Sequence, residues 1–184
     1  MWSLPYIFSG VPRFAHNFGL SEGGLEFFDR NSGTRLIADL DFLKALSDRW
    51  PGKLFVKGIT DVEDAYNAIK CGCTGIYVSN HGGRQLDGSR SPFDQLAEIV
   101  DAVGDKIDVI MDSGVQRGTH VLKALSLGAK AVGGGRFYLY ALAAAGQAGV
   151  ERALTLMKQE IERDMRLMGV KSIAELSRKN LRYR

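Results

Sequence analysis

Residues 79–87, SNHGGRQLD, bring a histidine, two glycines and an arginine together in one short run. Histidine is the side chain best tuned to exchange protons near neutral pH, and the planar guanidinium of arginine is well suited to clamp a carboxylate. His81 and Arg84 are three residues apart on what we expect to be a tight turn, so both can address one small anion. The run follows the apolar stretch GIYV, which indicates that it begins where a strand ends.

Three other predicted strands are also followed by residues suited to a site. The strand predicted around residues 54–57 ends at Lys57, and KIDVIMD at 106–112 ends at Asp112 and is followed by Ser113 and Gly114. The strand in KAVGG at 130–134 runs into GGGR at 133–136. Glycine-rich turns leave backbone N–H groups free to cradle a phosphate. A lysine beside an electron-poor ring can stabilise negative charge on it, so the set predicts oxidation of a small carboxylate by a phosphate-bearing cofactor.

Helices alternate with these strands along the chain. Apolar periodicity predicts a helix over 39–50, and Thr60 with Glu63 fits a capping box for a helix ending near Lys70. Ser91 followed by Pro92 predicts an N-cap and a first helical proline. Further helices are predicted over 117–127, 136–146 and 150–169, with a last short one near 172–175. AIKCGCTGIYV at 68–78 lines up with ALSLGAKAVGG at 124–134 as a faint internal repeat.

Four strands alternating with helices predict a parallel sheet. Repeated βα units with polar residues after each strand suit a (β/α)₈ barrel, whose site lies at the strand C-terminal ends. Four units are half of such a barrel, which typically needs about 250 residues, whereas this chain has 184. We therefore expect an irregular segment over 1–38 and the C-terminal half of a (β/α)₈ TIM barrel over 39–184.

Composition excludes several classes of protein. Twenty-four basic and 21 acidic residues give a net charge of +3, too balanced and scattered to predict nucleic-acid binding. We expect neither a signal peptide nor a membrane span. Cys71 and Cys73 lie too close for a disulfide framework and lack a second pair for a zinc site, so we expect no metal. We expect a cytoplasmic protein, with peripheral membrane or mitochondrial association left open.

Four stretches of the chain resemble one family. VKG, SNHGGRQLD, DSGVQRGTHVLKALSLGAKAV and GGGR are similar to the FMN-dependent α-hydroxy acid oxidases and dehydrogenases, which include glycolate oxidase, lactate oxidase, flavocytochrome-type lactate dehydrogenase and mandelate dehydrogenase. The resemblance runs from about Asp39 to the C-terminus. It implies that His81 is the catalytic base and that Arg84 binds the substrate carboxylate. It also implies that the following residues bind FMN: Lys57, Ser79, Asp112, Ser113, Gly114, Val115, Gln116, Gly135 and Arg136.

Several alternatives remain open at this stage. Lys57 could be a rim lysine that pairs with Asp112, and His120 fits an exposed position on the first turn of a helix. The family usually has arginine where this chain has Gln116, which predicts weaker FMN binding unless Arg117 supplies the charge. The carboxylate that orients the catalytic histidine in the family has no counterpart here.

The resemblance implies FMN-dependent oxidation of an L-2-hydroxy acid, lactate-like, to the 2-oxo acid. The alternative is a truncated, non-catalytic half-barrel that binds FMN or phosphate weakly or acts as an assembly partner. The expected partners are a small 2-hydroxy acid substrate and an electron acceptor, which is oxygen, a quinone or a cytochrome. Half a barrel also predicts exposed strand edges and apolar faces, so we expect a homo-oligomer or a complementing N-terminal half.

Overall fold

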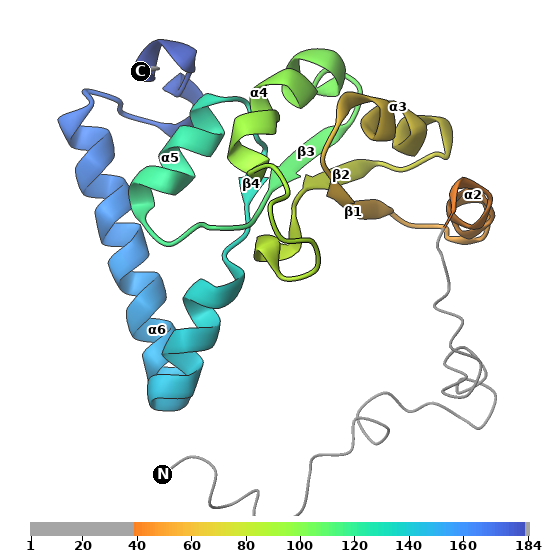
Figure 1. The fold of residues 1–184 in the computed structure, drawn as a ribbon. Coiled ribbons are helices and arrows are strands. Elements are labelled where there is room, and N and C mark those ends of the chain that lie inside the picture. Colours follow the sequence, from red (N-terminus) through yellow and green to blue (C-terminus); the bar gives the residue numbers. More distant parts are fainter. Residues whose placement is uncertain (1–38, 183–184) are drawn as a thin grey trace, which may run out of the picture. The chain divides into compact units, whose positions relative to one another are not determined.

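The structure, a computed structural model, describes residues 39–182 (Figure 1). The prediction of an irregular segment over 1–38 lies outside the described residues. Every strand and helix predicted after Asp39 is present. The elements are, in order, α2 (Leu40–Arg49), β1 (Phe55–Ile59), α3 (Val62–Lys70), β2 (Gly75–Val78), the 3₁₀ turn η4 (His81–Gly83), α4 (Pro92–Val103), β3 (Asp108–Met111), α5 (Gly118–Ser126), β4 (Ala131–Val132), α6 (Gly135–Leu167), and the 3₁₀ turns η5 (Ile173–Glu175) and η6 (Arg178–Asn180).

The four strands form one parallel sheet in the order β1-β2-β3-β4. Each strand lies beside the next one in the chain, and a helix connects each pair (Figure 1). This is the arrangement of four successive βα units of a (β/α)₈ barrel, so the predicted half-barrel is confirmed. Because all four strands run the same way, their C-terminal ends lie along one edge of the sheet.

One face of the sheet carries the hydrophobic core. Ile76 and Val78 of β2 and Val109 of β3 are almost completely buried there. Helices α3, α4 and α5 cover this face with their apolar stripes, which include Ala65, Ala68, Leu96, Ile99, Val103, Ala124 and Leu127. The opposite face corresponds to the inside of a barrel and is only partly covered in this chain, where Phe55, Tyr77 and Ile110 are half-buried.

A β-bulge interrupts β1 at Gly58. Lys57 is paired with Tyr77 and Ile59 with Val78, so Gly58 is an extra residue that has no partner on β2. Gly58 has a φ of +105°, which glycine tolerates far better than other residues. In an unbroken strand that kept Gly58 in register, Lys57 and Ile59 would be two positions apart and would point to the same face; because the bulge takes Gly58 out of the pairing, the two residues alternate as neighbours do. With it, Ile59 enters the core while Lys57 points to the inner face, at the edge where the predicted site lies.

The internal repeat corresponds to two equivalent helix ends. After α3, the N–H of Cys73 donates to the carbonyl of Ala68, and after α5 the N–H of Ala129 donates to that of Ala124. Gly72 and Gly128 lie between, with φ values of +88° and +105°. These are glycine-terminated helix ends of the Schellman type, which explains why each strand starts three residues after its glycine.

One predicted helix start differs in the structure, and a second one is confirmed without the expected side-chain hydrogen bond. The capping box of Thr60 and Glu63 is wrong: Asp61 is the N-cap, and its carboxylate accepts from the N–H of Asp64 at 2.8 Å. Because Asp61 is the N-cap, α3 begins at Val62. Glu63 is therefore the second residue of the helix, whereas a capping box requires the third. Ser91 is the N-cap of α4 as predicted, with Pro92 in the first turn, but its side chain makes no capping hydrogen bond.

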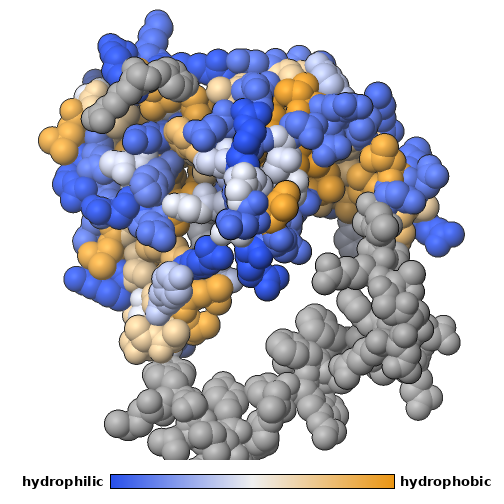
Figure 2. All heavy atoms as spheres, viewed as in Figure 1, coloured by the Kyte–Doolittle hydropathy of each residue, from blue (hydrophilic) through white to orange (hydrophobic). Residues whose placement is uncertain are grey.

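The two helices predicted over 136–146 and 150–169 form α6, which bends sharply at Ala145 and Gly146. Gly146 has a φ of +60°, and at this bend the chain reverses direction (Figure 1). Apolar side chains gather at the surface over the bend end of α6 (Figure 2). The large hydrophobic side chains exposed on the first part of this helix are Tyr138, Leu139, Tyr140 and Leu142. Within residues 39–182, no helix is both long and apolar enough to cross a membrane.

The edges of the sheet are open within the described residues. Strand β1 is paired only with β2, and β4 is paired only with β3. Unpaired backbone groups at a strand edge are a template for another strand. The prediction of exposed edges is therefore confirmed for this part of the chain.

We expect Gly75→Ala to destabilise the fold. Gly75 lies directly opposite Phe55, and a Cβ at Gly75 would overlap the Phe55 ring. That ring is held edge-on against Tyr77, with centroids 6.2 Å apart, so it cannot move freely. The expected loss is about 1–3 kcal/mol in the free energy of unfolding, measured by urea denaturation.

Phe55→Ala should remove most of this cost, so the two substitutions should be strongly non-additive. Gly135→Ala is the matched control, because a Cβ there meets no atom within 4 Å. Equal losses for Gly75→Ala with and without the Phe55 ring would contradict the proposed overlap.

Candidate functional site

A depression of about 450 Å³ lies at the C-terminal edge of the sheet. It is lined by all of the predicted site residues except Ser79, which lies beneath it and is completely buried. Three residues that were not predicted also line it: Gly82, Tyr138 and Leu139. Residues from four strand ends, which are up to 79 positions apart in sequence (from Lys57 to Arg136), therefore share one cavity. The full lining is Lys57, His81, Gly82, Arg84, Asp112, Ser113, Gly114, Val115, Gln116, Gly135, Arg136, Tyr138 and Leu139.

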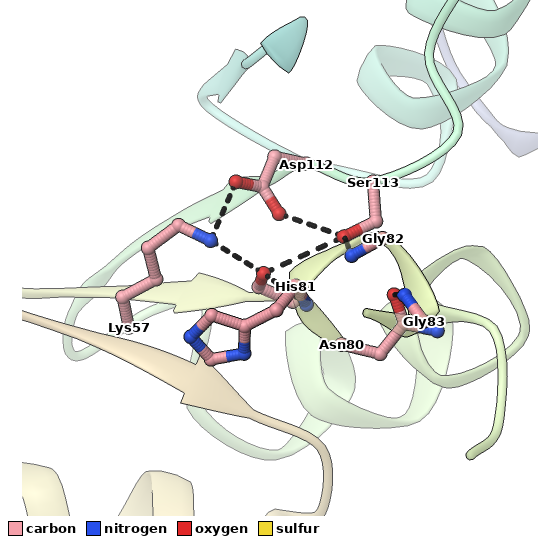
Figure 3. Close-up of polar contacts among 8 residues, drawn as sticks. Lys57, Asn80, His81, Gly82, Gly83, Asp112 and Ser113 are labelled. Carbon is pink, nitrogen blue, oxygen red and sulfur yellow. Dashed lines mark hydrogen bonds and ion pairs between the residues drawn. The ribbon is translucent and has the colours of Figure 1, made fainter. Parts of the chain in front are cut away.

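A polar network joins the ends of β1, β2 and β3 at the base of this depression (Figure 3). The ammonium of Lys57 lies 2.7 Å from Oδ2 of Asp112 and donates to Oγ of Ser79 at 2.6 Å. Ser113 donates its hydroxyl to Oδ1 of Asp112 at 3.0 Å and accepts from the N–H of Gly82 at 3.0 Å. The lysine–aspartate pair that the sequence left open as an alternative is therefore present.

The network sets the charge of Asp112. Burial by itself raises the pKa of the Asp112 carboxyl, but hydrogen bonds from Lys57, Ser79 and Ser113 and the charge of Lys57 outweigh it, so the pKa lies below its ordinary value of 3.8. Asp112 is therefore ionised at neutral pH. Its negative charge is matched by the Lys57 ammonium, which remains partly open to the depression.

The turn after β2 has an unusual backbone. His81, Gly82 and Gly83 follow one another with φ values of +56°, +69° and +71°. Two glycines make such a turn possible, and histidine is among the residues that enter the left-handed region more often than most. Asn80 holds the turn from within, because Oδ1 accepts from the N–H of Gly83 and Nδ2 donates to the carbonyl of Arg90.

Ser79 also anchors this turn. Its Oγ accepts from Lys57 and from the N–H of His81, the latter at 3.2 Å, and it lies 3.5 Å from Oγ of Ser113. Ser113 itself has a φ of +78°, which is costly for a residue other than glycine. Left-handed backbone at both His81 and Ser113 is held in place by hydrogen bonds between the two loops.

The imidazole of His81 lies apart from the polar network and beside the bulge (Figure 3). A Cβ at Gly58 would lie 3.0 Å from Cε1 of His81, so the glycine leaves room for the ring. The His81 side chain is exposed, and its imidazole makes no hydrogen bond to any residue of 39–182. Arg84 is also exposed, and its guanidinium has no ion-pair or hydrogen-bond partner in the same range. Both side chains are thus free to bind a ligand.

Helix α5 does not offer its N-terminus to a ligand. Glu160 of α6 accepts from the N–H of Gly118 at 2.8 Å, and Arg117 donates to the same carboxylate through Nε at 2.8 Å. Glycine is needed here because a Cβ at Gly118 would lie 2.7 Å from Cβ of Glu160. The guanidinium of Arg117 is thus engaged by Glu160, and the expectation that it compensates for Gln116 at a phosphate has no support in this geometry.

An anion cradle remains between the loop after β3 and the start of α6. The N–H groups of Gly114 and Gly135 make no hydrogen bond within the described residues, and a Cβ at either glycine would enter open space. Helix α6 has Gly134 as N-cap, without a side-chain cap, so its positive end is free. Arg136 stands beside it and donates to the carbonyl of Gly82 at 3.0 Å. These groups have the donor set that a phosphate requires.

His120 is half-buried in the first turn of α5 rather than exposed as the sequence suggested. Its Nδ1 accepts from the N–H of Gln116 at 3.2 Å. The histidine therefore fixes the backbone of the loop after β3 and leaves the Gln116 side chain exposed toward the depression. No group of three or more histidine, cysteine, aspartate or glutamate residues within 39–182 is placed to hold a metal ion.

Three supporting residues were missed by sequence reasoning. Asn80 lies within the quoted motif, so its position next to the glycines was a signal that could have been used. Glu160 acts from 42 positions beyond Gly118, and no local pattern announces it. Tyr138 is one of several aromatic residues in RFYLYALAA, which looked like helix packing.

A parallel βα array whose strand ends share one depression is the architecture of half a (β/α) barrel. The model of one family, FMN-dependent dehydrogenase, matches residues 15–183. The chain belongs to the FMN-dependent dehydrogenase family.

Relatives of known identity support this assignment. The chain is 48% identical over 143 residues to an L-lactate dehydrogenase of Vibrio cholerae, an alignment that covers 78% of this chain and 37% of the relative. The structure of a soluble mutant of the membrane-associated (S)-mandelate dehydrogenase of Pseudomonas putida superposes with a TM-score of 0.83 and 39% identity, covering 100% of this chain and 53% of that one. An L230A mutant of flavocytochrome b2 with benzoylformate matches with a TM-score of 0.75 and 44% identity, covering 78% and 38%. The chain thus spans between about a third and a half of these relatives.

We expect Asp112→Asn to destabilise the protein at neutral pH. The substitution leaves the Lys57 ammonium without its carboxylate, and loss of a charged hydrogen-bonding partner costs about 1.5–3 kcal/mol. Because the folded pKa of Asp112 is lowered, its contribution is complete above the ordinary carboxyl pKa of 3.8 and is lost as the pH falls through the folded value. Urea unfolding should therefore show a constant difference between pH 7 and about pH 5 that shrinks below about pH 4.

Asp105→Asn is the control, because Asp105 is exposed and its side chain makes no ion pair or hydrogen bond with any other residue of 39–182. If the two variants lost the same stability at pH 7, the network would not have the role described here.

Proposed function

We propose that this chain supplies the base, the carboxylate clamp and the phosphate cradle of an FMN-dependent 2-hydroxy acid dehydrogenase or oxidase. The single observation that carries the proposal is that His81, Arg84 and the loops at 112–116 and 135–136 line one depression. FMN, when bound, accepts the two electrons that the hydroxy acid loses. The substrate class follows from the lactate and mandelate dehydrogenases among the relatives.

Two side chains would act on the substrate. Arg84 has all its guanidinium donors free, so it can bind a carboxylate in a bidentate manner. His81 lies on the same turn with a free imidazole, so it can take a proton from the hydroxyl or the α carbon of the bound acid. Members of the family orient the equivalent histidine with a carboxylate. Within residues 39–182, no carboxylate bonds to His81. We propose that this group comes from outside the described part of the chain.

Lys57 would stabilise negative charge on the reduced cofactor. Its ammonium is held by Asp112 and Ser79, so it is fixed in position before any ligand arrives. Because Asp112 is ionised, the pair is close to neutral. The lysine can then shift its interaction toward a new negative charge without moving far.

The cofactor phosphate would bind at the start of α6. Gly114 and Gly135 offer free N–H groups, Gln116 offers an amide donor, and Arg136 has donors besides the one bound to Gly82. The uncapped helix end adds favourable electrostatics. The capped N-terminus of α5 is excluded from this role.

The expected partners are a lactate-like L-2-hydroxy acid and an electron acceptor, which we propose is oxygen, a quinone or a cytochrome. A second candidate function is a half-barrel that binds FMN without catalysis. It is favoured by the open edges of β1 and β4 and by the absence of a carboxylate at His81 in the described residues. We propose that a second copy or a complementing segment covers these edges in the active form.

Gln116→Arg should strengthen FMN binding about tenfold, because it adds a charged donor beside the phosphate cradle. FMN is titrated with the protein at two salt concentrations, and binding is monitored through the quenching of flavin fluorescence. Gln116→Glu is the matched variant and should weaken binding. If all three proteins bound FMN equally, the phosphate would lie elsewhere.

His81→Gln should abolish flavin reduction without loss of FMN. Removing a general base slows such a reaction by about 10²–10⁴-fold. The test is anaerobic bleaching of the flavin absorbance of the holoprotein by L-lactate and by (S)-mandelate. Rapid bleaching in the variant would refute the assigned role. FMN binding with no bleaching in the unsubstituted protein would favour the non-catalytic candidate.

A further inference from the structure

Gly82, the residue that directly follows His81, is held from two sides of the depression. Its N–H donates to Oγ of Ser113 in the loop after β3 at 3.0 Å (Figure 3). Its carbonyl accepts from Nη1 of Arg136 in the first turn of α6, also at 3.0 Å. The turn that carries His81 is therefore tied both to the sheet and to the helix whose start forms the anion cradle.

The backbone of this turn is unfavourable. His81, Gly82 and Gly83 have φ values between +56° and +71°. The left-handed conformation is costly at a histidine, and each glycine loses much conformational freedom when it is fixed. Within the turn, Asn80 binds the N–H of Gly83, and the N–H of Arg84 reaches the carbonyl of His81 only at 3.4 Å, which is long for a hydrogen bond. Contacts from outside the turn therefore add to how firmly His81 is held.

The guanidinium of Arg136 lies against the turn at Gly82. A Cβ at Gly82 would lie 3.2, 3.4 and 3.5 Å from Nη1, Cζ and Nη2 of Arg136, so the glycine leaves room for the guanidinium. Gly83 has nearly the same φ, +71° against +69°, but a Cβ there would meet no atom within 4 Å. The hydrogen bond and the close packing thus both place Arg136 at Gly82, and Gly83 is a matched position without this contact.

Arg136 keeps donors for a second partner. A guanidinium carries several N–H donors in one rigid plane. Within residues 39–182, only Nη1 of Arg136 is used, for Gly82, and Nε and Nη2 bond to no residue. The side chain lines the depression directly after Gly135, whose N–H belongs to the anion cradle. One rigid group can therefore bind an anion in the cradle and the carbonyl of Gly82 at the same time.

We propose that Arg136 is a positioning residue for His81. It binds the cofactor phosphate and the Gly82 carbonyl together, so that phosphate binding fixes the turn that carries the base. This role rests on the proposed function, because it takes the anion cradle as the phosphate site. An exposed arginine side chain samples many rotamers, and a bound anion restricts them. The hold on Gly82 therefore strengthens when phosphate binds, and the base is fixed after the cofactor has bound.

Inorganic phosphate is the probe, because it fits the cradle but has no ring that could touch the turn. It is added to the full chain without cofactor, with sodium chloride of equal ionic strength as the reference. Amide chemical shifts at Gly114 and Gly135 report phosphate in the cradle, and hydrogen exchange of the Gly82 and Gly83 amides reports the turn. We expect both exchange rates to fall about tenfold with phosphate. An arginine with a purely structural role would give the same rates with and without phosphate.

Arg136→Lys separates the charge from the planar group. The lysine keeps the positive charge, so phosphate should still shift Gly114 and Gly135. Its ammonium is a compact point charge that does not present the planar set of donors, so the slowing at the turn should be lost. Two alanine variants form a matched pair, each measured at the amide of the unchanged glycine. Gly82→Ala should lose the slowing because its Cβ crowds the guanidinium, whereas Gly83→Ala should keep it.

The outcomes distinguish this role from the proposed function. Phosphate that shifts Gly114 and Gly135 without slowing exchange in the turn would overturn the role of Arg136 and leave the cradle intact. Slowing that persists in Arg136→Lys, or an equal loss in the two alanine variants, would do the same. Phosphate that shifts neither glycine of the cradle would overturn the cradle itself and, with it, the role of Arg136.

Discussion

The contact between Lys57 and Asp112 is the interaction on which the strand-end site depends. It joins the ends of β1 and β3 across β2, and Ser79 fills the space between them with a hydroxyl that serves both loops. The left-handed backbone at His81 and Ser113 would be unfavourable in isolated turns. Within this network each loop supplies the hydrogen bonds that the other needs, so the positions of His81 and of the loop at 112–116 are fixed together.

The asymmetry between α5 and α6 has an electrostatic basis. Both helices begin next to the depression, and both carry a positive end there. Glu160 neutralises the N-terminus of α5 and ties it to α6. The N-terminus of α6 starts with glycines and has no capping carboxylate. Helix α5 thereby makes the edge of the depression rigid, and helix α6 contributes its dipole there. This division explains why two similar glycine-rich loops have different surroundings.

Much of this arrangement followed from the sequence, because the parallel βα pattern determines which strand ends meet. Lys57, His81, Asp112 and Gly135 could be assigned to one rim once four strands were recognised. The residues that support them could not be assigned in the same way. Glu160, which caps α5, acts over a long separation that leaves no local periodicity. The N-cap of α3 was assigned wrongly for a local reason. Thr60 and Asp61 are adjacent and both suit an N-cap, and only the backbone geometry shows that Asp61 has this role.

The bulge in β1 shows how one residue can serve function at the expense of regularity. If Gly58 were absent, Lys57 and Ile59 would alternate normally and would still point to the inner face and the core, so the sheet does not require the extra residue to place either side chain. What the extra residue provides is a stretch of backbone without a Cβ against the imidazole of His81. The strand thus carries an insertion whose benefit lies entirely in the neighbouring loop. A shortened β1 should give a more regular strand, but the His81 ring would lose the backbone without a Cβ against which it lies, so one backbone position balances the regularity of the sheet against room for one side chain.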